Sequence, residues 1–181
     1  MRITDIFDAV RDATYSDFRK FYTGDPNLFH KYTGLSLFQL LFVNDHNTDE
    51  KIKMIRFLIS EGADVNFKSP KDQRNALHIF YFSVMRPDPQ YILKVTQLLV
   101  EAGVNINAKD KYGAIPLNYA ITVVKLPTET ATCVTVLDHF LELRPFVSPC
   151  TRNALVCIDA GQLPIRSGSD HLGIHLLLHS V

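Results

Sequence analysis

Two segments in the middle of the chain carry almost the same pattern of hydrophobic and polar positions. Residues 54–66 and residues 95–107 each begin with apolar side chains at helical spacing, continue through a glycine, and end on an asparagine. Apolar side chains at this spacing give a helix one buried face. Gly62 and Gly103 follow the last apolar turn, where a glycine can adopt the left-handed conformation that ends a helix. The pattern predicts two equivalent amphipathic helices.

A second repeated feature is a short apolar segment around a leucine. Leu37, Leu77, Leu117 and Leu155 are separated by 40, 40 and 38 residues. Pro116 precedes the third of these leucines, and proline is favoured in the first turn of a helix. We therefore predict that each leucine marks the start of a short helix and that a longer helix follows it.

The remaining segments predict caps and joints. Residues 3–13 and 15–22 form an acid-rich helix pair, which suits a terminal repeat because such a repeat needs one solvated face. The extra length of each repeat lies between its two helices, where Thr48, Asp88 and Thr128 have the side chains that favour a helix start. Residues 171–180 predict a last helix after an irregular segment.

These residues together resemble the ankyrin repeat. Residues 62–66, Gly-Ala-Asp-Val-Asn, match the ending of that repeat, and residues 113–117 keep the glycine, proline and leucine of its opening. The spacing here is longer than the usual ~33 residues. The resemblance implies an all-α fold, an ankyrin-repeat solenoid of stacked antiparallel helix pairs joined by hairpin-like loops. It also implies that His78 orders neighbouring hairpins through hydrogen bonds.

The resemblance covers nearly the whole chain and implies one solenoid over residues 1–181. Its expected parts are an N-terminal capping helix pair, three repeats and an irregular C-terminal capping repeat, at residues 1–27, 28–66, 67–107, 108–147 and 148–181.

Composition limits the choice of partners and compartment. The chain has 19 basic and 19 acidic residues, so its formal net charge is zero, which disfavours a globally basic nucleic-acid binder. The first residues include acids where a signal peptide needs an apolar core. No apolar stretch is long enough to span a bilayer. Three cysteines without a close CxxC pair suit reduced thiols. We expect a cytoplasmic protein that does not bind membranes.

Charge is unevenly placed in the expected hairpin tips, residues 28–34, 67–74 and 108–113. These tips hold six basic residues, Lys31, Lys68, Lys71, Arg74, Lys109 and Lys111, against Asp72 and Asp110. Tyr32 and Tyr112 each follow a lysine, and aromatic side chains beside basic groups are typical of interface anchors. The tips are therefore predicted to dock an acidic protein surface. The alternative is that the lysines pair with the aspartates and that the tyrosines pack locally.

The resemblance implies a second binding surface, the concave face of the first helices. The residues two after each leucine are Gln39, Ile79, Tyr119 and Cys157. Exposed, the apolar side chains of this column, with Ile79 and Tyr119 at its centre, would form a binding groove. The alternative is that they belong to the core, where we also expect Phe80 and Phe82.

Residues with catalytic or metal-binding chemistry are few. His171, His175 and His179 share one face of the last predicted helix, and two histidines four residues apart can chelate a metal, which would use His171 and His175. Three in a straight row do not converge on one ion, which favours the polar stripe of a capping helix. The sequence has no phosphate-binding glycine loop, GxSxG or HExxH motif. We expect no catalytic residue and no cofactor.

The sequence thus predicts a non-enzymatic protein-protein interaction module that is monomeric alone. One version is an inhibitor or immunity protein that occludes a toxin or enzyme, and the other is an adaptor or host-directed effector. The alternative from another class is a nucleic-acid or anionic-ligand binder that uses the basic tips. Zero net charge and the absence of tryptophan make nucleic acid the less expected partner.

Overall fold

The computed structural model describes residues 3–82 and 88–122 of the chain. The chain divides into two compact units, Met1–Val136 and Leu137–Val181, and all described residues belong to the first. The predictions for Thr128, Leu155, Cys157, His171, His175 and His179 lie outside the described residues.

The described residues are mainly helical, as the all-α class requires. They form helices α1 (Ile6–Asp12), α2 (Tyr15–Phe21), α3 (Leu37–Leu40), α4 (Thr48–Ser60), α5 (Ala76–Phe82), α6 (Pro89–Glu101) and α7 (Pro116–Thr122), with strands β1 (Phe29–His30) and β2 (Leu35–Ser36) between α2 and α3. The two strands form an antiparallel hairpin in which Phe29 lies opposite Ser36.

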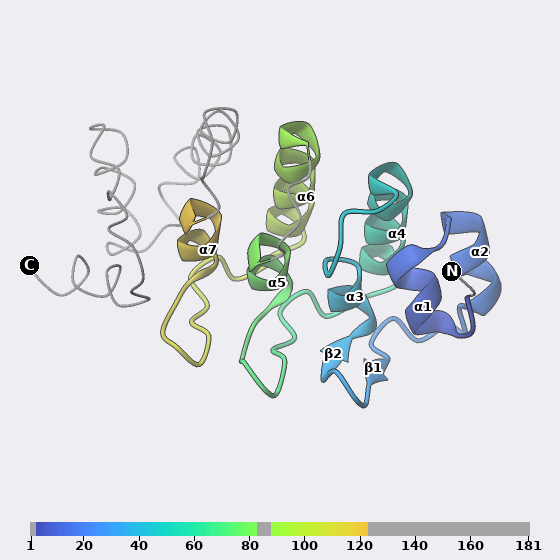
Figure 1. Ribbon diagram of the computed structural model, residues 1–181, viewed down its shortest axis with the longest axis horizontal. Coiled ribbons are helices and arrows are strands. Elements are labelled where there is room, and N and C mark those ends of the chain that lie inside the picture. Colours follow the sequence, from blue (N-terminus) through green and yellow to red (C-terminus); the bar gives the residue numbers. More distant parts are fainter. Residues whose placement is uncertain (1–2, 83–87, 123–181) are drawn as a thin grey trace, which may run out of the picture. The chain divides into compact units, whose positions relative to one another are not determined.

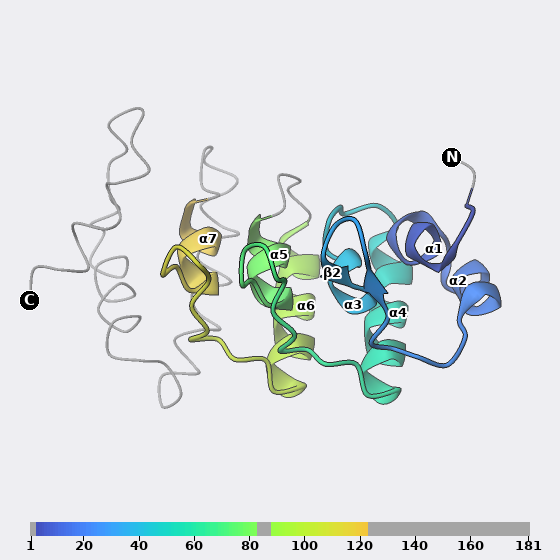
Figure 2. The ribbon, with the colours of Figure 1, turned by 90° about the horizontal axis from the view of Figure 1, so that it is seen from below.

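Short and long helices lie in two rows. The short helices α3, α5 and α7 contact one another in sequence order, and the long helix α4 contacts α6. Figures 1 and 2 show the loops that precede α3, α5 and α7 projecting away from the long helices. The pair α1 and α2 packs against α3 and α4, respectively. Loops far apart in the sequence therefore lie along the same edge of this unit.

Local sequence explains most helix ends. The Asp5 carboxylate caps α1 by accepting hydrogen bonds from the backbone amides of Phe7 and Asp8. The Thr14 hydroxyl caps α2 in the same way, so the predicted helix pair at the amino terminus is confirmed. Gly62 and Gly103 have φ of +87° and +83°, as predicted for glycines that close α4 and α6.

The predicted helix start at Thr48 is one residue late. Thr48 is the first residue of α4, and its N-cap is Asn47, whose backbone is left-handed with φ 53°. The Asn47 side chain does not cap the helix. It donates instead to the backbone carbonyl of Asp12, at 3.2 Å, which ties the joint to α1. Asp88 is the N-cap of α6 as predicted, and its carboxylate accepts from the amide of Gln90.

The spacing of leucines places the first short helix one residue out of register. Leu37 is the first residue of α3, whereas Leu77 and Leu117 are the second residues of α5 and α7. The residue equivalent to these two is therefore Phe38. The short helices begin at residues 37, 76 and 116, which are 39 and 40 residues apart.

Side chains from both rows form the core of the described residues. The largest fully buried apolar side chains are Phe18, Phe38, Phe42, Leu37, Leu41, Met54, Ile55, Leu58, Leu77 and Leu99. Burial of one such side chain contributes roughly 1.5–3 kcal/mol to the free energy of unfolding. Edge-to-face rings connect the helices, since Phe42 and Tyr91 lie 5.7 and 5.9 Å from Phe80 between ring centroids.

Candidate functional site

Asparagine side chains tie successive turns together beneath the hairpins. In both cases the side-chain oxygen accepts from a backbone amide and the side-chain nitrogen donates to the carbonyl of a helix-ending glycine. Asn27 makes these bonds at 2.7 and 3.3 Å, and Asn66 makes them at 2.6 and 2.9 Å. The four bonds join Asn27 to Asp64 and Gly62, and Asn66 to Asn105 and Gly103. The same contact thus recurs 39 residues later in the chain.

A buried polar residue in the first turn of each short helix reaches the next hairpin. The Gln39 amide donates to the backbone carbonyls of Phe67 and Arg74, at 2.9 and 2.8 Å. In α5 the residue at the same position is His78, whose Nε2 lies 3.1 Å from the carbonyl oxygen of Ala114. Burial lowers the pKa of His78, so the neutral ring that donates to this carbonyl is favoured. The predicted role of His78 in ordering hairpins is confirmed.

The hairpins are also closed internally and joined to one another. The Asp110 carboxylate accepts from the amides of Tyr112 and Ala114, at 2.9 and 3.0 Å, which holds the third tip in a tight turn. Between the second and third tips, the Lys111 amide donates to the Asp72 carbonyl at 3.0 Å. The backbone polar groups are engaged within the protein here, and the tip side chains are left to face outward.

Arg74 lies inside this arrangement. Its side chain is 11% exposed, and its Nε is 3.4 Å from a carboxylate oxygen of Asp110. Its Nη2 donates to the Tyr119 hydroxyl at 2.9 Å, and its guanidinium carbon lies 4.0 Å from the centre of the Phe82 ring. Burial raises the pKa of Tyr119 to about 12, so its hydroxyl keeps its proton. Arg74 and Tyr119, both predicted to contact a partner, instead hold the second hairpin against α7.

The six basic residues of the tips divide into two groups. Lys111 pairs with Asp72 at 2.6 Å and Arg74 pairs with Asp110, as the local-pairing alternative predicted. The pair with Lys111 lowers the pKa of Asp72. The other four basic residues are exposed, and within residues 3–82 and 88–122 none of them forms an ion pair. These four, which we call the tip lysines, are Lys31, Lys68, Lys71 and Lys109.

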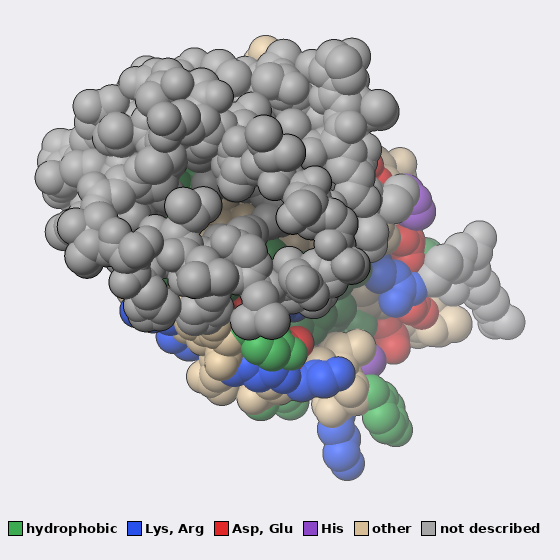
Figure 3. All heavy atoms as spheres, turned by 60° about the vertical axis from the view of Figure 1, so that its left-hand side comes forward, with side chains coloured by type: hydrophobic (Ala, Val, Ile, Leu, Met, Phe, Trp, Pro, Cys, Tyr) green, Lys and Arg blue, Asp and Glu red, His purple; other side chains and the backbone are tan. Residues whose placement is uncertain are grey.

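Large exposed apolar side chains gather on the same edge. Among the described residues these side chains are Phe29, Tyr32, Phe82 and Tyr112, with 44%, 91%, 54% and 60% of their surface exposed. Three of the four lie in hairpins, and Tyr32 has a ring contact only with His30, at 5.9 Å. Figure 3 shows blue and green side chains side by side along the lower edge of the molecule. Local packing of Tyr32, the alternative prediction, is therefore wrong.

The predicted concave column is not an exposed groove in the part of the chain that the structure describes. Ile79 is only 9% exposed and Phe80 is buried, so the core alternative is correct for both. Phe82, which we expected in the core, is exposed instead. It is the last residue of α5, and its ring lies over the Arg74 guanidinium and 5.5 Å from the Tyr119 ring. Gln39 does not belong to this column, because the register of the caps makes it equivalent to His78.

Lys51 is a buried cation that the sequence reasoning missed. The residue is 1% exposed, and its Nζ donates to the Leu41 carbonyl at 2.8 Å and to both oxygens of Asn44. Burial lowers its pKa to about 8. The position of Lys51 one helical turn before Met54 and Ile55 places it on the buried face of α4, and this spacing is visible in the sequence.

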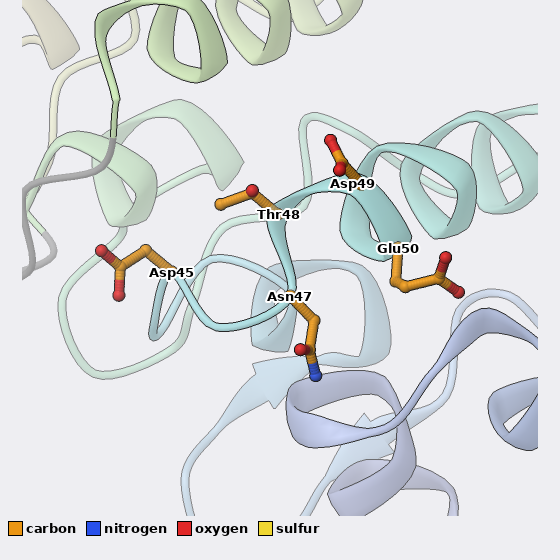
Figure 4. A pocket seen from close by; sticks show the side chains of 5 residues that line it. All are labelled: Asp45, Asn47, Thr48, Asp49 and Glu50. Atoms are coloured by element: carbon orange, nitrogen blue, oxygen red, sulfur yellow. The ribbon is translucent and has the colours of Figure 1, made fainter.

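An acidic hollow lies at the start of α4. Its lining consists of Asp45, Asn47, Thr48, Asp49 and Glu50. Figure 4 shows the three carboxylates pointing in different directions rather than toward a common point. The Glu50 carboxylate already accepts from the Tyr15 amide at 2.7 Å and from Lys53. In the described ranges no group of His, Cys, Asp and Glu side chains is arranged to hold a metal.

Comparison with known proteins adds no family. No protein-family model matches the chain, and no curated protein matches it significantly. None of the helices in the described part of the chain has the length and apolar character needed to cross a bilayer.

Proposed function

We propose that the chain is an ankyrin-type repeat protein without catalytic activity that binds another protein along its hairpin tips. The observation that carries this proposal is the edge formed by the tip lysines together with Tyr32 and Tyr112. Exposed aromatic side chains beside cations with no internal partner are typical of protein interfaces, and the fold itself does not use them.

Repetition of structure supports the ankyrin-type assignment. Helices α4 and α6 both have 13 residues and begin 41 residues apart, and each is followed by a left-handed glycine. Asn27 and Asn66 make the same pair of bonds to the following turn. These equivalences support a stack of helix pairs, with the proposed repeats at residues 28–66, 67–107 and 108–147.

Among binding modules, an inhibitor or immunity protein agrees best with the edge. Inhibition by occlusion benefits from a surface that is formed before binding, because less conformational entropy is then lost. The bonds between Lys111 and Asp72 provide such rigidity. An adaptor or host-directed effector would use two surfaces at once, and Ile79, the centre of the second candidate surface, is buried. Either version would act in the cytoplasm.

Site-specific photo-crosslinking in an extract of the native source tests the proposal. Benzoylphenylalanine replaces Tyr32 or Tyr112 in two variants, and Arg56 on the exposed side of α4 in a control. We expect the two tip variants to capture the same protein and the control not to capture it. Lys71→Glu should abolish this capture, whereas Lys94→Glu, an exposed lysine of α6, should not. Capture of nucleic acid by the tips, or of the same protein by all three variants, would contradict the proposal.

A further inference from the structure

The proposed binding edge has a definite order of side chains. The first tip presents Lys31 and Tyr32, the second presents Lys68 and Lys71, and the third presents Lys109 beside Tyr112. Aromatic side chains therefore stand at both ends of the edge, and the second tip, between them, contributes lysines but no exposed aromatic side chain.

The length of this edge follows from the packing of the helices beneath it. Helices in contact lie about 8–10 Å apart, so two steps from α3 through α5 to α7 separate the outer tips by roughly 16–20 Å. Contacts between the tips agree with this close spacing, because a Pro70 carbon lies 3.7 Å from where a Cβ on Gly34 would be. An extended chain rises about 3.3 Å per residue. Five or six extended residues therefore span the outer tips.

The charged groups favour carboxylates over phosphates as ligands. A lysine ammonium is a compact charge on a flexible stem, whereas recognition of phosphate favours the two-pronged guanidinium of arginine. The one arginine of the tips, Arg74, is turned inward onto Asp110. The Asp72 carboxylate also lies in the second tip, where it would oppose an uninterrupted phosphate backbone.

Resting on the proposed function, we infer that the edge binds an extended acidic peptide segment with an apolar residue at each end. About five acidic residues cross the tip lysines, and the two apolar side chains contact Tyr32 and Tyr112. The partner is thus recognised by a short acidic stretch of its chain rather than by a broad folded surface.

Fluorescence anisotropy with synthetic peptides tests this inference on the full chain. The probe is a fluorescein-labelled peptide in which five glutamates separate two leucines. The comparison peptides have five glutamines, or two glutamates, between the leucines. We expect the five-glutamate probe to bind at least tenfold more tightly than either comparison peptide. Lys71→Glu and Lys109→Glu should each weaken it about tenfold, and Lys94→Glu should leave its affinity unchanged.

The aromatic ends require a separate comparison. Tyr32→Ala and Tyr112→Ala should each weaken the probe severalfold, but should have no effect on a peptide in which glycines replace the leucines. Equal binding of the glutamine peptide, or tighter binding of a ten-nucleotide oligo-dT strand, would overturn the inference. So would a second copy of the chain as the occupant, detected as self-association that Lys71→Glu removes.

The two proposals fail in different ways. If the tips crosslink to a protein but the glutamate probe does not bind, the binding function stands and the acidic segment is wrong. If the probe binds and crosslinking captures no protein from the tips, the proposed function is wrong.

Discussion

Lys51 places a charged amine where almost no water reaches it. Carbonyl oxygens of Leu41 and Asn44 surround its Nζ, and burial lowers its pKa to about 8. The unfolded chain holds this proton to near the ordinary pKa of 10.5. Between these two values the unfolded state binds more protons than the folded state, so the free energy of unfolding rises with pH.

Comparison of the wild type with Lys51→Met across pH 7.5–9.5 isolates this effect. We expect the free energy of unfolding of the wild type to rise by about 2 kcal/mol relative to the variant over this interval. Urea unfolding at several pH values measures it, and buried tyrosines do not interfere because they titrate at higher pH. Parallel pH profiles for the two proteins would show that the Lys51 pKa is not shifted.

Arg74 contributes through geometry as well as charge. It contacts Asp110, the Tyr119 hydroxyl and the Phe82 ring at the same time. We expect Arg74→Met to lower the free energy of unfolding by about 3 kcal/mol, because the buried Asp110 carboxylate loses its cation. Arg74→Lys should cost about 1 kcal/mol, since it keeps the charge but loses the planar contacts. Lys71→Met, on the same hairpin, is the control, and an equal effect from it would refute this role of Arg74.

Among the elements, the turns that follow α4 and α6 are joined by one side chain. Asn66 accepts from the Asn105 amide and donates to the Gly103 carbonyl, at 2.6 and 2.9 Å. Asn66→Ala removes both bonds and should lower the free energy of unfolding by about 1–2 kcal/mol. Asn66→Asp removes only the donor and should cost less. Urea unfolding of both variants checks this order, and a variant Asn66→Ala as stable as wild type would show that the two bonds are dispensable.

Element by element, local chemistry made the helices predictable. Asp5, Thr14, Asp88 and the two helix-ending glycines act on residues within one turn of themselves, so their roles follow from the sequence alone. The register of α3 did not, because counting leucines ignored the cap at Ser36, which fixes where the helix begins. A cap three residues before a polar side chain, as in Ser36–Gln39, is the better marker.

The candidate site was predictable only in part, for a physical reason. Exposure of Lys71 and Tyr32 needs no distant partner and follows from their place at a tip. The inward position of Arg74 depends on Asp110 and Tyr119, which lie 36 and 45 residues later in the chain. Pairings across that distance are visible only when the hairpins are seen side by side.

At the scale of the whole molecule, stacking of equivalent units has a testable consequence. If each unit touches only its neighbours, an extra copy of residues 67–107 inserted after residue 107 should be accommodated. We expect the longer protein to fold, to gain helical circular dichroism in proportion to its added length, and to melt at an equal or higher temperature. Thermal melting followed at 222 nm provides the measurement. Loss of cooperative melting would argue against the repeat assignment.

The asparagine bonds between turns have a further consequence for how the protein can change. Asn27 and Asn66 hold the units together from the base of the hairpins, whereas Lys31, Lys71 and Tyr32 at the tips take no part in those bonds. Recognition and folding are therefore inherited through different residues. The tips can accumulate substitutions and acquire a new binding preference while selection on the fold acts elsewhere, which leaves the edge free to follow a partner that itself evolves.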